Sequence, residues 1–131
     1  MTGFSPPAGV PAIEFQGVEK RFAARGSSAE VLAARDVTFS IAPGEVVSII
    51  GPSGCGKSTL LNMGSGLAKP SAGLVKVAGE MVTGPNPHVS FMLQKDLLMP
   101  WRTIAQNIEF GLELRGVKAA ARREVSARLL E

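Results

Sequence analysis

A nine-residue segment near the middle of the chain has the residue types and spacing that hold a phosphate chain. It reads Gly51-Pro52-Ser53-Gly54-Cys55-Gly56-Lys57-Ser58-Thr59, and it contains the pattern Gly-x-x-x-x-Gly-Lys-Ser of a phosphate-binding loop. Its glycines accept backbone torsions that other residues avoid, so the loop can curl and direct several N–H groups toward one anion. A helix beginning near Lys57 would add its positive N-terminal end to the site.

Three side chains of this segment complete the predicted site. Lys57 supplies a point charge for the β- and γ-phosphates, and Ser58 offers its hydroxyl to Mg²⁺. Thr59 is expected to reach the α-phosphate. The segment therefore predicts a site for ATP with Mg²⁺. Cys55, the single cysteine of the chain, is interpreted as a loop filler exposed mainly through its backbone, rather than as the reactive thiol that a helix start can create.

The predicted elements around the loop are those that such a site requires. Residues 45–50 form a nearly continuous β-branched run, which is expected of a strand buried on both faces of a parallel sheet. A helix is expected to follow the loop, from about residue 57 to residue 67. Other strands are expected at residues 12–18, 37–41, 74–78 and 89–93. Two further helices are expected at residues 104–114 and 118–131, separated by Gly116.

The composition favours one small domain. The chain has 131 residues, of which 45% are hydrophobic and 19% charged, and this is enough apolar material for a core. The net charge of +3 is spread along the sequence, which favours a solvated surface over a nucleic-acid partner. A single cysteine excludes an internal disulfide and suits a reducing compartment.

The sequence gives no sign of secretion or of a membrane span. The N-terminus lacks the basic start and apolar run of a signal peptide, and the longest strongly apolar run, residues 46–50, is too short to cross a bilayer. We expect a cytoplasmic protein that contacts a membrane only through a partner. Residues 1–11 hold three prolines and two glycines and are expected to form a disordered leader.

The loop and the residues after it closely resemble the ATP-binding subunits of ABC transporters. The similarity rests on three motifs in register: the loop with its following Leu-Leu-Asn, the segment 66–73, and a predicted strand that ends in Gln94. The next residues, 95–103, look like the bacterial importer branch that serves nitrate, taurine, aliphatic sulfonates or related small nutrients. The resemblance covers residues 12–131.

This resemblance implies an α/β fold. The chain would contain a P-loop NTPase core, incomplete here, with an N-terminal antiparallel β subdomain and the start of a helical subdomain. Residues 12–131 would form a partial nucleotide-binding domain. Its β subdomain and phosphate-binding loop would occupy residues 12–94, and the glutamine loop and first helices would occupy residues 95–131.

Two further site residues are implied by the resemblance. Phe22 falls where the family places an aromatic residue, usually Tyr, that stacks on adenine, and a phenyl ring face suffices for stacking. The alternative is that Phe22 is an ordinary core residue. Gln94 falls at the glutamine that contacts Mg²⁺ and the attacking water. Lys57 and Gln94 are therefore the predicted catalytic residues.

The resemblance also implies a membrane partner. Four large apolar residues follow Gln94 in a segment without helix or strand period: Leu97, Leu98, Met99 and Trp101. A surface cluster of this kind marks a docking site, and in the family this region receives a short cytoplasmic helix of the membrane-spanning permease. The alternative is that Trp101 packs under the helix at 104–114. A second ATP-binding subunit and a peripheral location on the inner face of the cell membrane are implied for the complete protein.

Several parts of the family's pattern are absent from these 131 residues. There is no Leu-Ser-Gly-Gly-Gln signature, no apolar strand ending in Asp-Glu, and no late switch histidine. We therefore expect ATP-driven uptake of a small nutrient by the complete protein, and no ATP hydrolysis by this chain alone. A stand-alone, non-catalytic nucleotide-binding module is the alternative. The strand expected at residues 45–50 would also lack a neighbour, which leaves unpaired backbone groups beside apolar surface.

Overall fold

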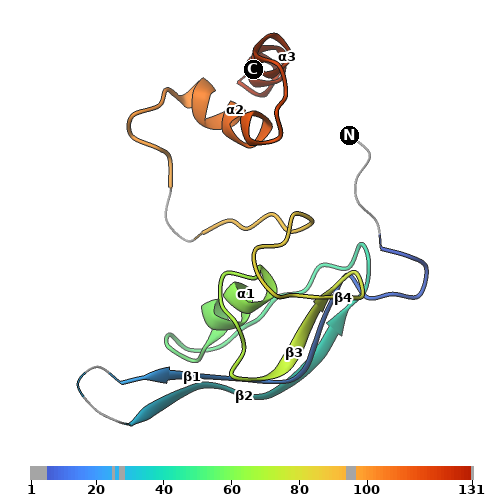
Figure 1. Cartoon of the computed structure of the whole chain (residues 1–131), viewed down its shortest axis with the longest axis vertical. Coiled ribbons are helices and arrows are strands. Elements are labelled where there is room, and N and C mark those ends of the chain that lie inside the picture. Colours follow the sequence, from blue (N-terminus) through green and yellow to red (C-terminus); the bar gives the residue numbers. More distant parts are fainter. Residues whose placement is uncertain (1–5, 25, 27–28, 94–96, 131) are drawn as a thin grey trace. The chain divides into compact units, whose positions relative to one another are not determined.

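The computed structural model of the chain describes residues 6–24, 26, 29–93 and 97–130. The chain divides into two compact units, Met1–Phe91 and Met92–Glu131, whose elements are labelled in Figure 1. No helix within the described ranges is long and apolar enough to cross a membrane. Residues 1–5 of the predicted leader lie outside the described part. In its remainder, the N–H of Val10 donates to the carbonyl of Pro7 at 3.0 Å.

A four-stranded antiparallel sheet is the frame of the first unit. Its strands, in the spatial order β2-β1-β3-β4, are β1 (Ile13–Ala23), β2 (Glu30–Ile41), β3 (Ala72–Val77) and β4 (Glu80–Met81). β1 lies between β2 and β3 and pairs with both (Figure 1). β1 and β2 are longer than the strands predicted at 12–18 and 37–41. Their pairing continues to Ala23 and Glu30, so cross-strand hydrogen bonds extend both strands beyond their apolar alternation.

β2 contains an irregularity that lies beside the phosphate-binding loop. Lys20 of β1 pairs with Ala34, and Arg21 pairs with Leu32. Ala33 is therefore an extra residue with no direct partner in β1. An extra residue of this kind bends its strand and turns part of the backbone out of the ladder.

The core of the first unit lies between the sheet and helix α1 (Lys57–Gly64). Three residues of the sheet and one of the helix are buried together: Phe15, Val18, Val75 and Met63. Full burial of a side chain such as Met63 stabilises a fold by about 1.5–3 kcal/mol. This contact anchors the helix whose first turn follows the loop.

The end of α1 differs from the prediction. The helix ends at Gly64 rather than at residue 67. Gly66 has a φ of +79°, and a Cβ on it would lie 1.8 Å from the carbonyl oxygen of Gly84. The chain therefore leaves the helix early because it passes against the backbone of Gly84, and glycine permits both the torsion and the approach.

Two predicted strands do not form. Residues 45–50 and 89–93 belong to no strand, so the predictions of a buried parallel strand and of a short strand before Gln94 are wrong. Val46 is 94% exposed and Ile50 is 92% exposed. An extended segment becomes a strand only when its N–H and C=O groups pair with a neighbour, and no strand of the described part pairs with either segment. Residues 45–50 are expected to lack a neighbouring strand, and their backbone pairs with no strand of the described part.

The second unit is a pair of helices, α2 (Ile104–Leu114) and α3 (Ala119–Leu129). α2 occupies its predicted range. Thr103 Oγ1 accepts the N–H of Gln106 at 3.2 Å, and Gln106 Oε1 accepts the N–H of Thr103 at 2.9 Å. This reciprocal capping box defines where the helix begins. Gly116, with a φ of +73°, separates the two helices as predicted, and α3 lies inside its predicted range.

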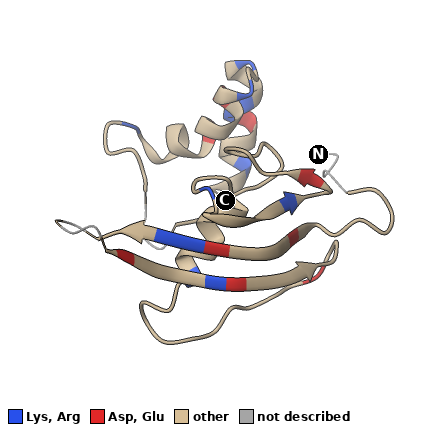
Figure 2. Ribbon diagram, turned by 60° about the horizontal axis from the view of Figure 1, so that its bottom comes forward, with Lys and Arg blue, Asp and Glu red and all other residues tan. Residues whose placement is uncertain are grey.

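Acidic and basic residues are interspersed along the strands and helices (Figure 2). On the sheet, Arg21 Nη2 donates to Glu19 at 3.0 Å, and Lys76 Nζ lies 3.8 Å from Glu14. The hydrogen bond to Glu19 is the main cause that raises the pKa of Arg21 above its usual value. The basic residues of the described part are thus spread over several elements rather than gathered in one tract.

Candidate functional site

The loop at residues 51–56 leads directly into the first turn of α1. Gly56 is the N-cap residue and has a φ of 96°. A Cβ on Gly56 would lie 2.3 Å from the carbonyl oxygen of Ala33, the extra residue of β2. Glycine alone fits both this torsion and this close approach. Contact with the sheet therefore fixes the place where the helix begins.

The first turn of α1 carries no counter-charge. No side chain caps the helix at Gly56, and its first turn contains no acidic residue. The first N–H groups of a helix lack intrahelical partners and carry partial positive charge. Ser58 is exposed and Thr59 is half-buried in this turn, so both hydroxyls start at the positive end of the helix. Such an end is suited to an anion.

The Lys57 side chain folds back over the loop. Its Nζ donates to the carbonyl oxygens of Gly51 at 2.8 Å and Pro52 at 2.6 Å. Both acceptors are neutral, so they hold the ammonium in place without cancelling its charge. The predicted point charge is therefore positioned within the loop.

Cys55 occupies space inside the same loop. Its Sγ lies 3.4 Å from Lys57 Nζ, and it stands 2.8 Å from the position that a Cβ on Gly51 would take. The thiol is free, and the residue is exposed. Gly51, Pro52, Ser53 and Gly54 are exposed as well, whereas Gly56 is half-buried.

Phe22 is a surface residue of β1 rather than part of the core. The residue is 46% exposed, so the alternative of an ordinary core residue is wrong. Its direct partner in β2 is Val31, and the Nζ of Lys20 lies 5.1 Å from the centroid of its ring. Val31 is two residues from Ala33, or about 7 Å along the strand at about 3.3 Å per residue. Since Ala33 touches the loop at Gly56, Phe22 lies on the part of the sheet next to the loop.

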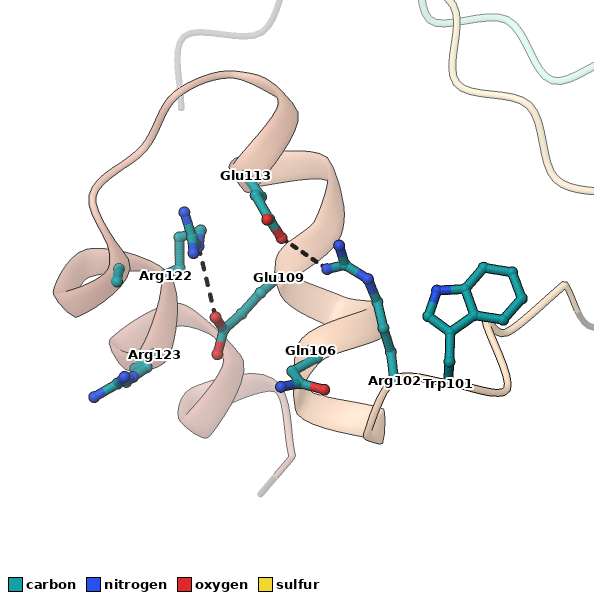
Figure 3. A pocket seen from close by; sticks show the side chains of 8 residues that line it. Trp101, Arg102, Gln106, Glu109, Glu113, Arg122 and Arg123 are labelled. Carbon is teal, nitrogen blue, oxygen red and sulfur yellow. Dashed lines mark hydrogen bonds and ion pairs between the residues drawn. The ribbon is translucent and has the colours of Figure 1, made fainter.

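Gln94, the predicted contact for Mg²⁺ and the attacking water, lies outside the described residues. The apolar segment after it is described from Leu97 onward. Leu97, Leu98 and Trp101 are exposed, and Trp101 is 78% exposed. The Trp101 side chain points away from α2 (Figure 3), so the alternative that it packs under this helix is wrong.

Asn107 holds the backbone of this apolar segment against α2. Its Oδ1 accepts the N–H of Met99 at 2.8 Å, and its Nδ2 donates to the carbonyls of Met99 at 3.2 Å and Thr103 at 3.0 Å. A side chain that accepts from the N–H of a residue and also donates to the C=O of that residue fixes a turn without regular structure. The apolar side chains are thus displayed from an ordered backbone.

A hollow of about 460 Å³ lies between α2, α3 and Trp101. Figure 3 shows the two ion pairs that line it. Arg102 Nη1 lies 2.7 Å from Glu113, and Arg122 Nε lies 3.6 Å from Glu109. The hydrogen bond from Arg102 is the main cause that lowers the pKa of Glu113 below its usual value. These pairs join α2 to the loop before it and to α3.

Sequence reasoning missed Lys20, Asn107 and the Ala33 bulge. Lys20 carries a weak signal, because alternate residues of a strand share a face and Phe22 is two positions away. Asn107 sits three residues after the helix start, where an amide can reach back to the preceding turn. The bulge has no local signal, since it depends on how two strands pair.

Comparison with known protein families and relatives gives consistent matches. The family model described as ABC transporter matches residues 34–131. The taurine import ATP-binding protein TauB of Yersinia pestis bv. Antiqua (strain Antiqua) is 42% identical over 75% of this chain and 38% of its own length. The nitrate import ATP-binding protein NrtC of Synechococcus elongatus is 48% identical over 64% of this chain and 13% of its own length. The chain therefore spans less than half the length of these curated relatives.

A solved structure has a similar fold. The ATP-binding cassette MJ0796, in a dimeric post-hydrolysis state bound to ADP and Pi, superposes with a TM-score of 0.78 and 27% identity. The match covers 88% of this chain and 54% of that one.

Proposed function

Because the chain belongs to the ABC transporter family, we propose that it binds Mg-ATP at residues 51–59 and forms part of the ATP-binding component of an importer for a small nutrient. The observation that carries the proposal is the geometry of the loop. A bent glycine loop enters a helix whose positive end has no capping side chain, and Lys57 Nζ is already held within the loop.

Each part of the nucleotide has a proposed partner. The loop N–H groups and Lys57 receive the β- and γ-phosphates, Ser58 supplies a hard oxygen ligand to the Mg²⁺ that accompanies ATP, and Thr59 reaches the α-phosphate. Phe22 offers its exposed ring to adenine. Gln94 contacts Mg²⁺ and the attacking water in the complete protein.

The exposed apolar segment is the proposed contact with a membrane-spanning permease. A short cytoplasmic helix of that subunit contacts four apolar residues: Leu97, Leu98, Met99 and Trp101. This contact places the complete protein at the inner face of the cell membrane. A second ATP-binding subunit lies beside it. Support comes from the exposure of Trp101 and from the backbone that Asn107 holds in place. A nucleotide that draws Gln94 toward Mg²⁺ would shift this neighbouring segment, which couples the state of ATP to the permease.

The nutrient is proposed from the relatives, which are named for taurine and nitrate import. In the complete transporter, taurine or nitrate should stimulate ATP hydrolysis. Failure of both compounds to do so would remove the support for this substrate class.

The binding proposal is tested by thermal melting of the 131-residue chain with and without Mg-ATP. A ligand at about 100 times its Kd stabilises the folded state by about 2.7 kcal/mol, so Mg-ATP should raise the melting temperature. Lys57→Ala should abolish this increase, because the variant lacks the ammonium held in the loop. Lys118→Ala, an exposed lysine just before α3, is the matched control and should respond like the unmodified chain. Identical melting of the unmodified chain with and without Mg-ATP would contradict the proposal.

A further inference from the structure

Lys20 makes two contacts that hold its ammonium at one place on the sheet. Its Nζ donates to the carbonyl oxygen of Lys69 at 2.8 Å, in the segment between α1 and β3. The same atom lies 5.1 Å from the centroid of the Phe22 ring. The carbonyl thus fixes a cation over the aromatic face, within the distance at which the two attract each other.

This arrangement leaves the Phe22 ring with one occupied face. The ring is 46% exposed, and the ammonium covers the face toward Lys20. The negative face of an aromatic ring attracts a cation and repels the electron-rich face of another ring. A cation on one side reduces that repulsion on the other side, so the remaining surface becomes better suited to a flat, electron-rich base.

We infer that Lys20 is a positioning residue that holds Phe22 as a platform for a purine base; this inference rests on the proposed binding of ATP at the adjacent loop. Lys20 acts on the ring, because its Nζ lies over the ring face while it donates to the carbonyl of Lys69; binding of tripolyphosphate distinguishes this role from a phosphate contact. The platform belongs to the part of the sheet that meets the loop, because Ala33 approaches Gly56 only two residues from the partner of Phe22.

The test compares binding of ATP with binding of inorganic tripolyphosphate, which has no base. Lys20→Gln keeps a donor for the Lys69 carbonyl and removes the cation. It should weaken ATP binding by no more than about fivefold, the upper limit for an exposed cation–aromatic contact, because the contact also exists in the free chain. It should leave tripolyphosphate binding unchanged. Lys20→Arg should restore ATP affinity, because a guanidinium supplies both the donor and the cation. Lys76→Gln removes one lysine from the same sheet and should bind both ligands like the unmodified chain.

A double-variant cycle separates the proposed role from a general effect of charge. In a Phe22→Leu background, Lys20→Gln should cause no further loss of ATP affinity. Equal weakening of ATP and tripolyphosphate by Lys20→Gln would overturn the inference in favour of a phosphate contact, and unchanged ATP affinity would overturn it as well. If Lys20→Gln does not fold, ATP affinity in Lys20→Arg decides, and a loss larger than twofold there overturns it. Failure of the unmodified chain to bind either ligand would instead refute the proposed function.

Discussion

Cys55 is the residue best placed to report whether a triphosphate enters the loop. It is the single cysteine of the chain, its thiol is exposed, and its Sγ lies 3.4 Å from Lys57 Nζ. Phosphates bound by the loop would cover this thiol. We expect Mg-ATP to slow alkylation of Cys55 by N-ethylmaleimide, measured by mass spectrometry over time. In Lys57→Ala the nucleotide should give no protection. Equal alkylation rates with and without Mg-ATP in the unmodified chain would place the nucleotide elsewhere.

At the scale of the elements, the end of α1 depends on Gly66. A Cβ there would lie 1.8 Å from the Gly84 carbonyl oxygen, at a φ of +79°. Gly66→Ala should therefore lower the free energy of unfolding by at least about 2 kcal/mol, from the torsion and the overlap together. Gly44 has the same φ of +79° with nothing within 4 Å, so Gly44→Ala isolates the torsional effect and should lower it by about 1 kcal/mol. Chemical denaturation of both variants gives the comparison, and equal losses would show that the contact with Gly84 is unimportant.

The ion pair between Arg102 and Glu113 gives the helical unit a predictable pH response. Arg102 lowers the pKa of Glu113 in the folded chain. A lowered folded-state pKa contributes stability that is fully present above the ordinary value of 4.5 for this carboxyl and is lost as the pH falls through the folded-state pKa. Glu113→Gln should therefore melt at a lower temperature than the unmodified chain at pH 7, and the difference should shrink as the pH falls below the unfolded-state pKa and disappear once the pH is below the folded-state pKa.

Glu124→Gln is the matched control for this measurement. Glu124 is an exposed residue of α3, and no ion pair involving it occurs among the described residues. Its substitution should leave the melting temperature unchanged at pH 7. A Glu113→Gln difference that persisted unchanged at low pH would show that the side chain acts through packing rather than through its charge.

At the scale of the whole molecule, the fold is that of an ATP-binding cassette with an incomplete P-loop core, as the resemblance implied. The antiparallel sheet and the two-helix unit correspond to the N-terminal β subdomain and the start of the helical subdomain. The proposed contact with a permease is the apolar segment at residues 97–101, where Leu97, Leu98 and Trp101 are exposed. Its role is best tested in the complete protein, where both the nucleotide and the membrane subunit can be offered.

Trp101→Ala in the complete protein should reduce co-purification with the membrane subunit while ATP binding persists. The residue is 78% exposed, so the substitution should change the free energy of unfolding by no more than about 0.5 kcal/mol. Leu114→Ala, a similarly exposed apolar residue at the end of α2, should leave the association unchanged. Unchanged association of the Trp101 variant would remove this segment from the proposed contact.

The sequence by itself determined the features whose physics is local. The phosphate-binding loop follows from glycine torsions and a lysine within nine residues, and α2 follows from the apolar spacing of residues 104–114. The structure adds the capping box of Thr103 and Gln106, which defines where α2 begins. Only the tertiary structure decided features that depend on distant partners. Residues 45–50 have the composition of a buried strand but form none, because a strand requires a paired neighbour. Lys20 covers Phe22 because the carbonyl of Lys69, 49 residues away, fixes its ammonium.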